Sequence, residues 1–168
     1  ISKNYMVFST GLFTLYVIPR FAEIYSVHDF KKEVFYIYKT ILPFFAIGML
    51  LIYLFRMLII DVVYPGFFDM EPLFKWQLSA DFVRLSAIVL AHQFLAKKML
   101  ISYIITEFIS IILFYVFSKL LVNSYGIEGI VMAHLYRYIV YFIVVIIAIG
   151  YHFKNKKDAM PPSTLDML

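Results

Sequence analysis

The sequence contains no cysteine, and it is poor in charged residues, glycine and proline. Without cysteine, disulfides, thiol catalysis and cysteine-ligated metal sites are excluded. Charged residues make up 15% of the chain, whereas soluble domains have about 25%. Six glycines and six prolines in 168 residues are too few for a loop-rich or fibrous protein. Since 63% of the residues are apolar and the mean hydropathy is +0.86, the composition predicts a membrane protein.

Five segments are long and apolar enough to cross a bilayer as helices, because each covers roughly 30 Å at 1.5 Å per residue. The alternation typical of barrel strands is missing, and open sheet edges are not tolerated in lipid. We therefore expect one all-α integral membrane domain over residues 1–157. The expected helices lie at about residues 4–24, 34–60, 72–96, 99–122 and 129–153, and residues 158–168 are expected to form a disordered cytoplasmic tail.

The basic residues predict the orientation of the chain. If successive connections alternate between the two sides, one side has eight Lys and Arg residues and the other has three. Because cytoplasmic loops are enriched in these residues, the first side is expected in the cytoplasm, together with the C-terminus. That side holds Arg20, Lys31, Lys32, Lys97, Lys98, Lys154, Lys156 and Lys157, and the other holds Lys3, Lys75 and Lys119.

The net charge of +4 does not indicate nucleic-acid binding, because the basic residues flank apolar segments. The four histidines have no metal-ligand spacing, and neither a P-loop nor a G-x-S-x-G motif is present. We expect no enzyme activity, no metal and no cofactor. The chain starts at Ile1 with its first apolar run almost at once, so we expect it to be the C-terminal part of something larger.

The third expected helix carries a polar stripe. Gln77, Asp81, Arg84 and His92 fall within an arc of about 80° at 100° per residue. A charge at the bilayer centre costs roughly 2.5–3.5 kcal/mol, so this stripe is expected to face a bundle interior or a watery cavity. Asp81 and Arg84 are three residues apart and can pair, so an inert structural ion pair is the alternative interpretation.

Other helices carry isolated polar groups. On the fifth expected helix, His134, Arg137, Tyr138 and Tyr141 share one face. Arg56 follows an apolar run, where an arginine can also extend to the interface.

The fourth expected helix has a row of Ser102, Thr106 and Ser110, which is typical of helix packing. Glu107 lies off that row and is a candidate partner for Arg137 or a proton carrier. Across the bundle, the inward faces carry more cations than anions, which suits a phosphate or pyrophosphate ligand.

Three stretches carry a resemblance to a known family: "LYVIPRFAEI", "GFFDMEPLFKWQLSADFVRLSAIVLAHQFLAKKM" and "YGIEGIVMAHLYRYIVYF". They resemble the C-terminal half of lipid-linked oligosaccharide flippases, in the branch of the O-antigen and enterobacterial common antigen flippases. These belong to the multidrug/oligosaccharidyl-lipid/polysaccharide exporter superfamily. The resemblance covers about residues 12–151, and its most specific element is Trp76-Gln77-Leu78 followed by Asp81 and Arg84.

The resemblance implies a twelve-helix protein of two six-helix lobes, in which this chain supplies five helices of one lobe and an N-terminal lobe is missing. It also implies a bacterial inner-membrane flippase that moves an undecaprenyl-pyrophosphate-linked oligosaccharide from the cytoplasmic to the periplasmic leaflet by alternating access. The implied partners are membrane lipid, the glycan lipid and the missing lobe. The expected substrate-binding residues are Arg20, Arg56, Gln77, Arg84 and Arg137, with Asp81 and Glu107 as ion-coupling or ion-pair candidates.

Three other functions stay open at this point. A drug or cation antiporter of the same superfamily would need acids to dominate its cavity. A membrane-embedded glycan ligase or polymerase would need a large outer loop, and the longest outer connection expected here is residues 61–72. A small structural subunit becomes the better interpretation only if Ile1 lies close to a true start.

Overall fold

The computed structural model describes residues 2–24 and 26–158. Over these residues the chain is helical with no strand, which confirms the all-α fold class. Most of the expected tail, residues 159–168, lies outside the described residues. The helices are α1 (Ser2–Glu23), α2 (Val27–Leu54), α3 (Arg56–Val63), the 3-10 helix η1 (Phe68–Met70), α4 (Leu73–Ala96) and α5 (Leu100–Asp158).

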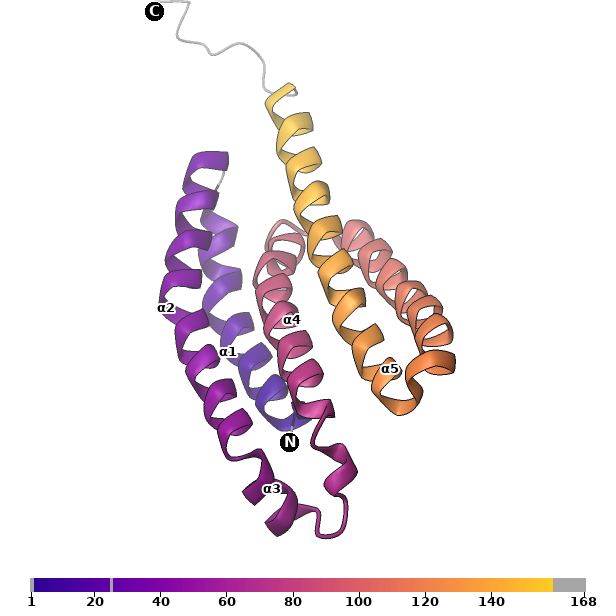
Figure 1. Cartoon of the computed structure of the whole chain (residues 1–168). Helices are drawn as coiled ribbons and strands as arrows, with labels where there is room; N and C mark the ends of the chain where they lie inside the picture. Colours follow the sequence, from indigo (N-terminus) through magenta and orange to yellow (C-terminus); the bar gives the residue numbers. More distant parts are fainter. Residues whose placement is uncertain (1, 25, 159–168) are drawn as a thin grey trace, which may run out of the picture.

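Helix α5 is bent into a hairpin at Gly126, whose φ of 55° and ψ of −133° are not helical. Its first arm, residues 100–125, and its second arm, residues 127–158, run in opposite directions (Figure 1). Glycine is needed here because side chains with a Cβ avoid this backbone conformation. The sequence predicted two helices separated by a turn over residues 123–129, and the structure turns within that stretch.

The second expected helix differs most from the structure. It was predicted over residues 34–60, whereas α2 begins at Val27 and ends at Leu54, and α3 follows after a break at Phe55. The early start follows from Ser26, whose hydroxyl accepts a hydrogen bond from the Asp29 backbone N–H at 3.0 Å. This side-chain cap satisfies a free donor of the first turn, so the polar stretch before residue 34 is helical.

Helix α4 lies in the middle of the bundle and packs against α1, α2 and α5 (Figure 1). Its C-terminal half is buried on nearly all sides, from Leu85 to Phe94. A helix in this position can present one face to a pocket and another to the apolar core. Tyr38 of α2 contacts the face of α4 that is turned toward the core, where its hydroxyl donates to the Ser86 backbone carbonyl at 2.6 Å.

Within the part of the chain that the structure describes, three helices are long and apolar enough to cross a membrane: Val27–Leu54, Leu73–Ala96 and the bent α5 over Leu100–Lys154. The chain is therefore an all-α, multi-pass membrane chain. One end of the bundle holds the α1–α2 and α4–α5 connections and the end of α5 (Figure 1). The other end holds α3, η1 and the turn at Gly126.

Candidate functional site: a polar pocket between α1, α4 and α5

A polar pocket of about 270 Å³ lies between α1, α4 and both arms of α5. It brings together groups that are far apart in the sequence, including two guanidinium groups and one carboxylate. The polar side chains that line it are Thr10, Thr14, Arg84, His92, Tyr103, Glu107, Arg137, Tyr138 and Tyr141.

The two arginines of the pocket share one aromatic ring. The Arg84 guanidinium carbon lies 5.4 Å from the centre of the Tyr138 ring, and that of Arg137 lies 4.4 Å from it. Arg137 also donates from an Nη atom to the Tyr138 hydroxyl at 2.6 Å, and it lies 5.3 Å from the ring of Phe114. These contacts hold both guanidinium groups through cation–π attraction and hydrogen bonding. Within the described residues, neither arginine forms an ion pair with a carboxylate.

Glu107 supplies the acid of the pocket. The Tyr141 hydroxyl donates to Glu107 Oε1 at 2.8 Å, and Tyr141 itself is almost fully buried. Arg137 and Glu107 line the same pocket, yet no ion pair joins them among the described residues. The pocket therefore holds a carboxylate that is bound by a tyrosine, and the two guanidinium groups keep donors for another acceptor.

The polar stripe of α4 faces this pocket at Arg84 and His92. Nearer the start of the helix, Asp81 is fully buried and accepts a hydrogen bond from the Gln77 amide at 3.1 Å. Gln77 and Asp81 do not line the pocket, but they lie on the same helix, about two turns and one turn before Arg84 respectively. Their expected roles in substrate binding and ion coupling stay predictions.

His92 connects α4 to α1 within the pocket. Its Nε2 atom lies 3.1 Å from the Thr14 hydroxyl oxygen, and its Nδ1 atom lies 2.6 Å from the backbone carbonyl of Ile88. The imidazole is held at both ring nitrogens, so its orientation in the pocket is fixed.

Arg20 and Arg56 lie outside the pocket. Arg20 is exposed near the end of α1, with Nη1 3.7 Å from a Glu33 carboxylate oxygen. Arg56 lies at the start of α3, at the other end of the bundle, where its Nε donates to Glu71 Oε1 at 2.5 Å. It also lies 4.4 Å from the ring centre of Tyr53. The structure thus places these two expected binding residues at opposite ends of the bundle and away from Arg84 and Arg137.

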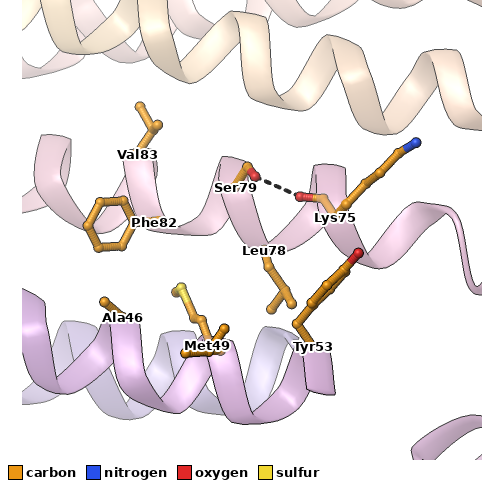
Figure 2. A pocket seen from close by; sticks show the side chains of 9 residues that line it. Ala46, Met49, Tyr53, Lys75, Leu78, Ser79, Phe82 and Val83 are labelled. Atoms are coloured by element: carbon orange, nitrogen blue, oxygen red, sulfur yellow. Dashed lines mark hydrogen bonds between the residues drawn. The ribbon is translucent and has the colours of Figure 1, made fainter. Parts of the chain in front are cut away.

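A second hollow lies between α2 and α4 and has a volume of about 510 Å³. Figure 2 shows its lining, in which Ala46 and Met49 face Leu78 and Phe82 across the gap. The ammonium of Lys75, at one end, lies 3.5 Å from Glu128 of α5. Most of this lining is apolar. Of its polar groups, the Ser79 hydroxyl donates to the Lys75 carbonyl and the Lys75 ammonium lies beside Glu128, so the hollow is less suited to an anion than the polar pocket.

Sequence reasoning did not single out Thr10, Thr14 or Tyr103, which also line the polar pocket. Thr10 and Thr14 are four residues apart in a largely apolar stretch of the chain, and that spacing places both on one face of a helix. This was the available signal, but threonines at this spacing are also typical of helix packing in membranes.

The chain is similar to two curated proteins. It is 32% identical over 143 residues to the lipid III flippase of Escherichia coli (strain K12), and equally to that of Shigella flexneri. The match covers 84% of this chain but 34% of each relative, so the chain spans about a third of their length. No protein-family model matches the chain, and no solved structure matches it.

Both relatives are named as flippases, which are transporters rather than enzymes. The match supports the family resemblance that the sequence predicted and the expectation that the chain is not an enzyme. Helical, apolar and multi-pass, the chain is related to the lipid-linked oligosaccharide flippases of the lipid III type, of which it matches a fragment.

Proposed function

We propose that the chain is part of a flippase for an undecaprenyl-pyrophosphate-linked oligosaccharide, and that the polar pocket binds the pyrophosphate. The observation that carries this proposal is the pair Arg84 and Arg137, held on one Tyr138 ring in one cavity without an ion-pair partner among the described residues.

The physical argument starts from the cost of burying cations in a membrane. Each charge at bilayer depth costs at least roughly 2.5 kcal/mol, and a structural role for two arginines would favour pairing each with an acid. Here the one carboxylate of the pocket, Glu107, takes a hydrogen bond from Tyr141 instead. Guanidinium groups present several N–H donors in a plane, which matches the oxygens of a phosphate or pyrophosphate. Two of them facing one cavity are therefore suited to a doubly charged anionic linker.

Translocation needs no bond to be made or broken. In the proposed mechanism the pyrophosphate and sugars occupy the cavity, the polyprenyl chain stays in membrane lipid, and rocking of two lobes opens the cavity to either side. This chain supplies most of one lobe in that arrangement, and an N-terminal lobe supplies the rest. The protein lies in the bacterial inner membrane with the C-terminus in the cytoplasm.

Binding of inorganic pyrophosphate to the detergent-solubilised chain tests the pocket, with isothermal titration calorimetry as the measurement. Arg84→Gln and Arg137→Gln are expected to weaken binding at least about tenfold each, since a charge-assisted hydrogen bond contributes roughly 1.5–3 kcal/mol. Arg20→Gln is the matched control, because Arg20 lies outside the pocket. Equal affinities for all four proteins would overturn the assignment of the pocket.

Transport is tested in a hybrid protein, in which this chain replaces the matching segment of the E. coli lipid III flippase. The hybrid is expected to restore surface glycan in a strain without that flippase, and Arg84→Gln is expected to abolish the rescue at unchanged protein level. Normal glycan from the Arg84→Gln hybrid would contradict a substrate role.

The orientation has its own test. Alkaline phosphatase folds into its active form only outside the cytoplasm. A fusion after Lys157 is therefore expected to be inactive in cells, and a fusion after Asn123 is expected to be active. The reverse pattern would overturn the proposed topology.

A further inference from the structure

The hydrogen bonds around His92 cannot all form with a neutral ring. The Ile88 carbonyl oxygen, 2.6 Å from Nδ1, can only accept, so Nδ1 carries a hydrogen. The Thr14 hydroxyl, 3.1 Å from Nε2, has a single hydrogen, and it donates that hydrogen to the Thr10 carbonyl at 2.8 Å. With its hydrogen used in this way, Thr14 can only accept from His92. This orientation of the Thr14 hydroxyl requires a hydrogen on Nε2 as well, so it fits an imidazolium ring.

A second arrangement satisfies a neutral ring. If His92 loses the hydrogen on Nε2, the Thr14 hydroxyl can rotate from the Thr10 carbonyl to donate to Nε2, while Nδ1 keeps its bond to Ile88. The hydrogen on Nδ1 is thus the same in both states, and the proton gained or lost is the one on Nε2. His92 and Thr14 together form a site with two satisfied protonation states, which is unusual for a residue that is 4% exposed.

This site belongs to the polar pocket. Among the residues that the structure describes, the charged groups of the pocket apart from His92 are Arg84 from α4 and Glu107 and Arg137 from α5, and none comes from α1. The other titratable groups that face it are the hydroxyls of Tyr103, Tyr138 and Tyr141. An empty pocket therefore already carries an excess of positive charge, which opposes a further proton on His92. A bound anion reverses that balance.

We infer that His92 is a proton-binding residue of this pocket, and that it takes up a proton on Nε2 when an anion enters, with Thr14 as the partner that reorients. This inference rests on the proposed function, because it assigns the anion to the same pocket. It adds a third cation to the anion site and makes anion binding and proton uptake reciprocal, as linkage requires.

Nitrogen NMR of the ring measures this directly. The chain is labelled with ¹⁵N-imidazole histidine in lipid nanodiscs, the His92 signals are assigned with His92→Gln, and pH is varied with and without inorganic pyrophosphate. We expect the hydrogen to stay on Nδ1 throughout, and the midpoint of Nε2 protonation to move to higher pH when pyrophosphate is added. His28, which is exposed and lies 3.5 Å from Asp29, is the internal control whose midpoint should not move.

Calorimetry gives the second measurement. If His92 gains a proton when pyrophosphate binds, raising the pH opposes binding. The pyrophosphate affinity of the wild type is therefore expected to fall with rising pH more steeply than that of His92→Gln. The difference between the two proteins approaches about tenfold per pH unit for one linked proton. Pyrophosphate itself titrates, but its contribution is the same for both proteins and cancels in the comparison.

The outcomes separate the two proposals. Two results would overturn the proton role without contradicting the anion pocket. One is a pyrophosphate affinity with the same pH dependence in wild type and His92→Gln, and the other is a pH midpoint of His92 protonation that does not change when pyrophosphate is added. Absence of pyrophosphate binding at any pH overturns both. A neutral ring with its hydrogen on Nε2 contradicts the hydrogen-bond geometry from which the inference starts.

Discussion

The indole Nε1 of Trp76 donates a hydrogen bond to Glu128 Oε1 at 2.5 Å. The bond joins the first turns of α4 to the start of the second arm of α5, directly after the bend at Gly126. Lys75 approaches the same carboxylate at 3.5 Å. One acid thereby fixes the end of the α5 hairpin against the central helix.

Two substitutions of Glu128 distinguish the hydrogen bond to Trp76 from the ion pair with Lys75. Glu128→Ala is expected to lower the free energy of unfolding by about 1 kcal/mol, because the Trp76 donor loses its acceptor. Glu128→Gln is expected to cost less, since its amide oxygen can still accept from the indole while the charge opposite Lys75 is lost. Chemical denaturation followed by tryptophan fluorescence measures both, and equal losses would show that the charge, not the indole bond, matters.

The bend of α5 predicts a contrast among its glycines. Gly126→Ala is expected to lower the free energy of unfolding by about 1–3 kcal/mol, because its φ of 55° and ψ of −133° suit glycine alone. Gly129→Ala is also expected to destabilise, since a Cβ there would collide with the backbone carbonyl of Leu121.

Gly150→Ala is the matched control for both substitutions. A Cβ at Gly150 meets nothing within 4 Å, and alanine favours the helix by up to about 1 kcal/mol. Thermal unfolding of the three variants in one detergent gives the ranking. A Gly126→Ala protein as stable as the Gly150→Ala protein would show that the bend does not need glycine.

Arg56 provides a test that separates a structural role from substrate binding. Its bond to Glu71 at 2.5 Å ties the start of α3 to the segment that follows η1. If this bond is its role, Arg56→Gln and Glu71→Gln in the E. coli hybrid are expected to have similar, small effects on glycan export. If Arg56 binds the substrate, as the sequence predicted, Arg56→Gln alone should abolish export.

Tyr138 is expected to hold the pocket arginines through both its ring and its hydroxyl. Tyr138→Phe keeps the ring beside Arg84 and Arg137 but removes the acceptor for Arg137, so it should lower the free energy of unfolding by about 1.5 kcal/mol. Tyr138→Leu also removes the cation–π contacts and should cost roughly a further 1 kcal/mol. Pyrophosphate binding is expected to weaken in the same order. Stronger binding by the leucine variant would mean that the ring blocks the pocket.

Much of the site could be predicted helix by helix. The spacing of Arg84 and His92 placed them on one face of α4, and the spacing of Arg137, Tyr138 and Tyr141 did the same in α5; in the structure these residues line one pocket. Arg20 and Arg56 resembled them in the sequence, since each is a single cation beside an apolar run. Only the structure separates them, because a helical repeat fixes which side chains share a face but not which neighbour that face meets.

The sequence by itself determined that the chain is helical and lies in a membrane, because its few charged groups cannot cover a surface and lipid requires backbone bonds within each segment. It also indicated the turn at Gly126. The tertiary structure decided that Thr14 of α1 meets His92 of α4, and that Arg84 and Arg137 meet on Tyr138. Those contacts depend on how the helices rotate and pack against each other, which short-range periodicity does not specify.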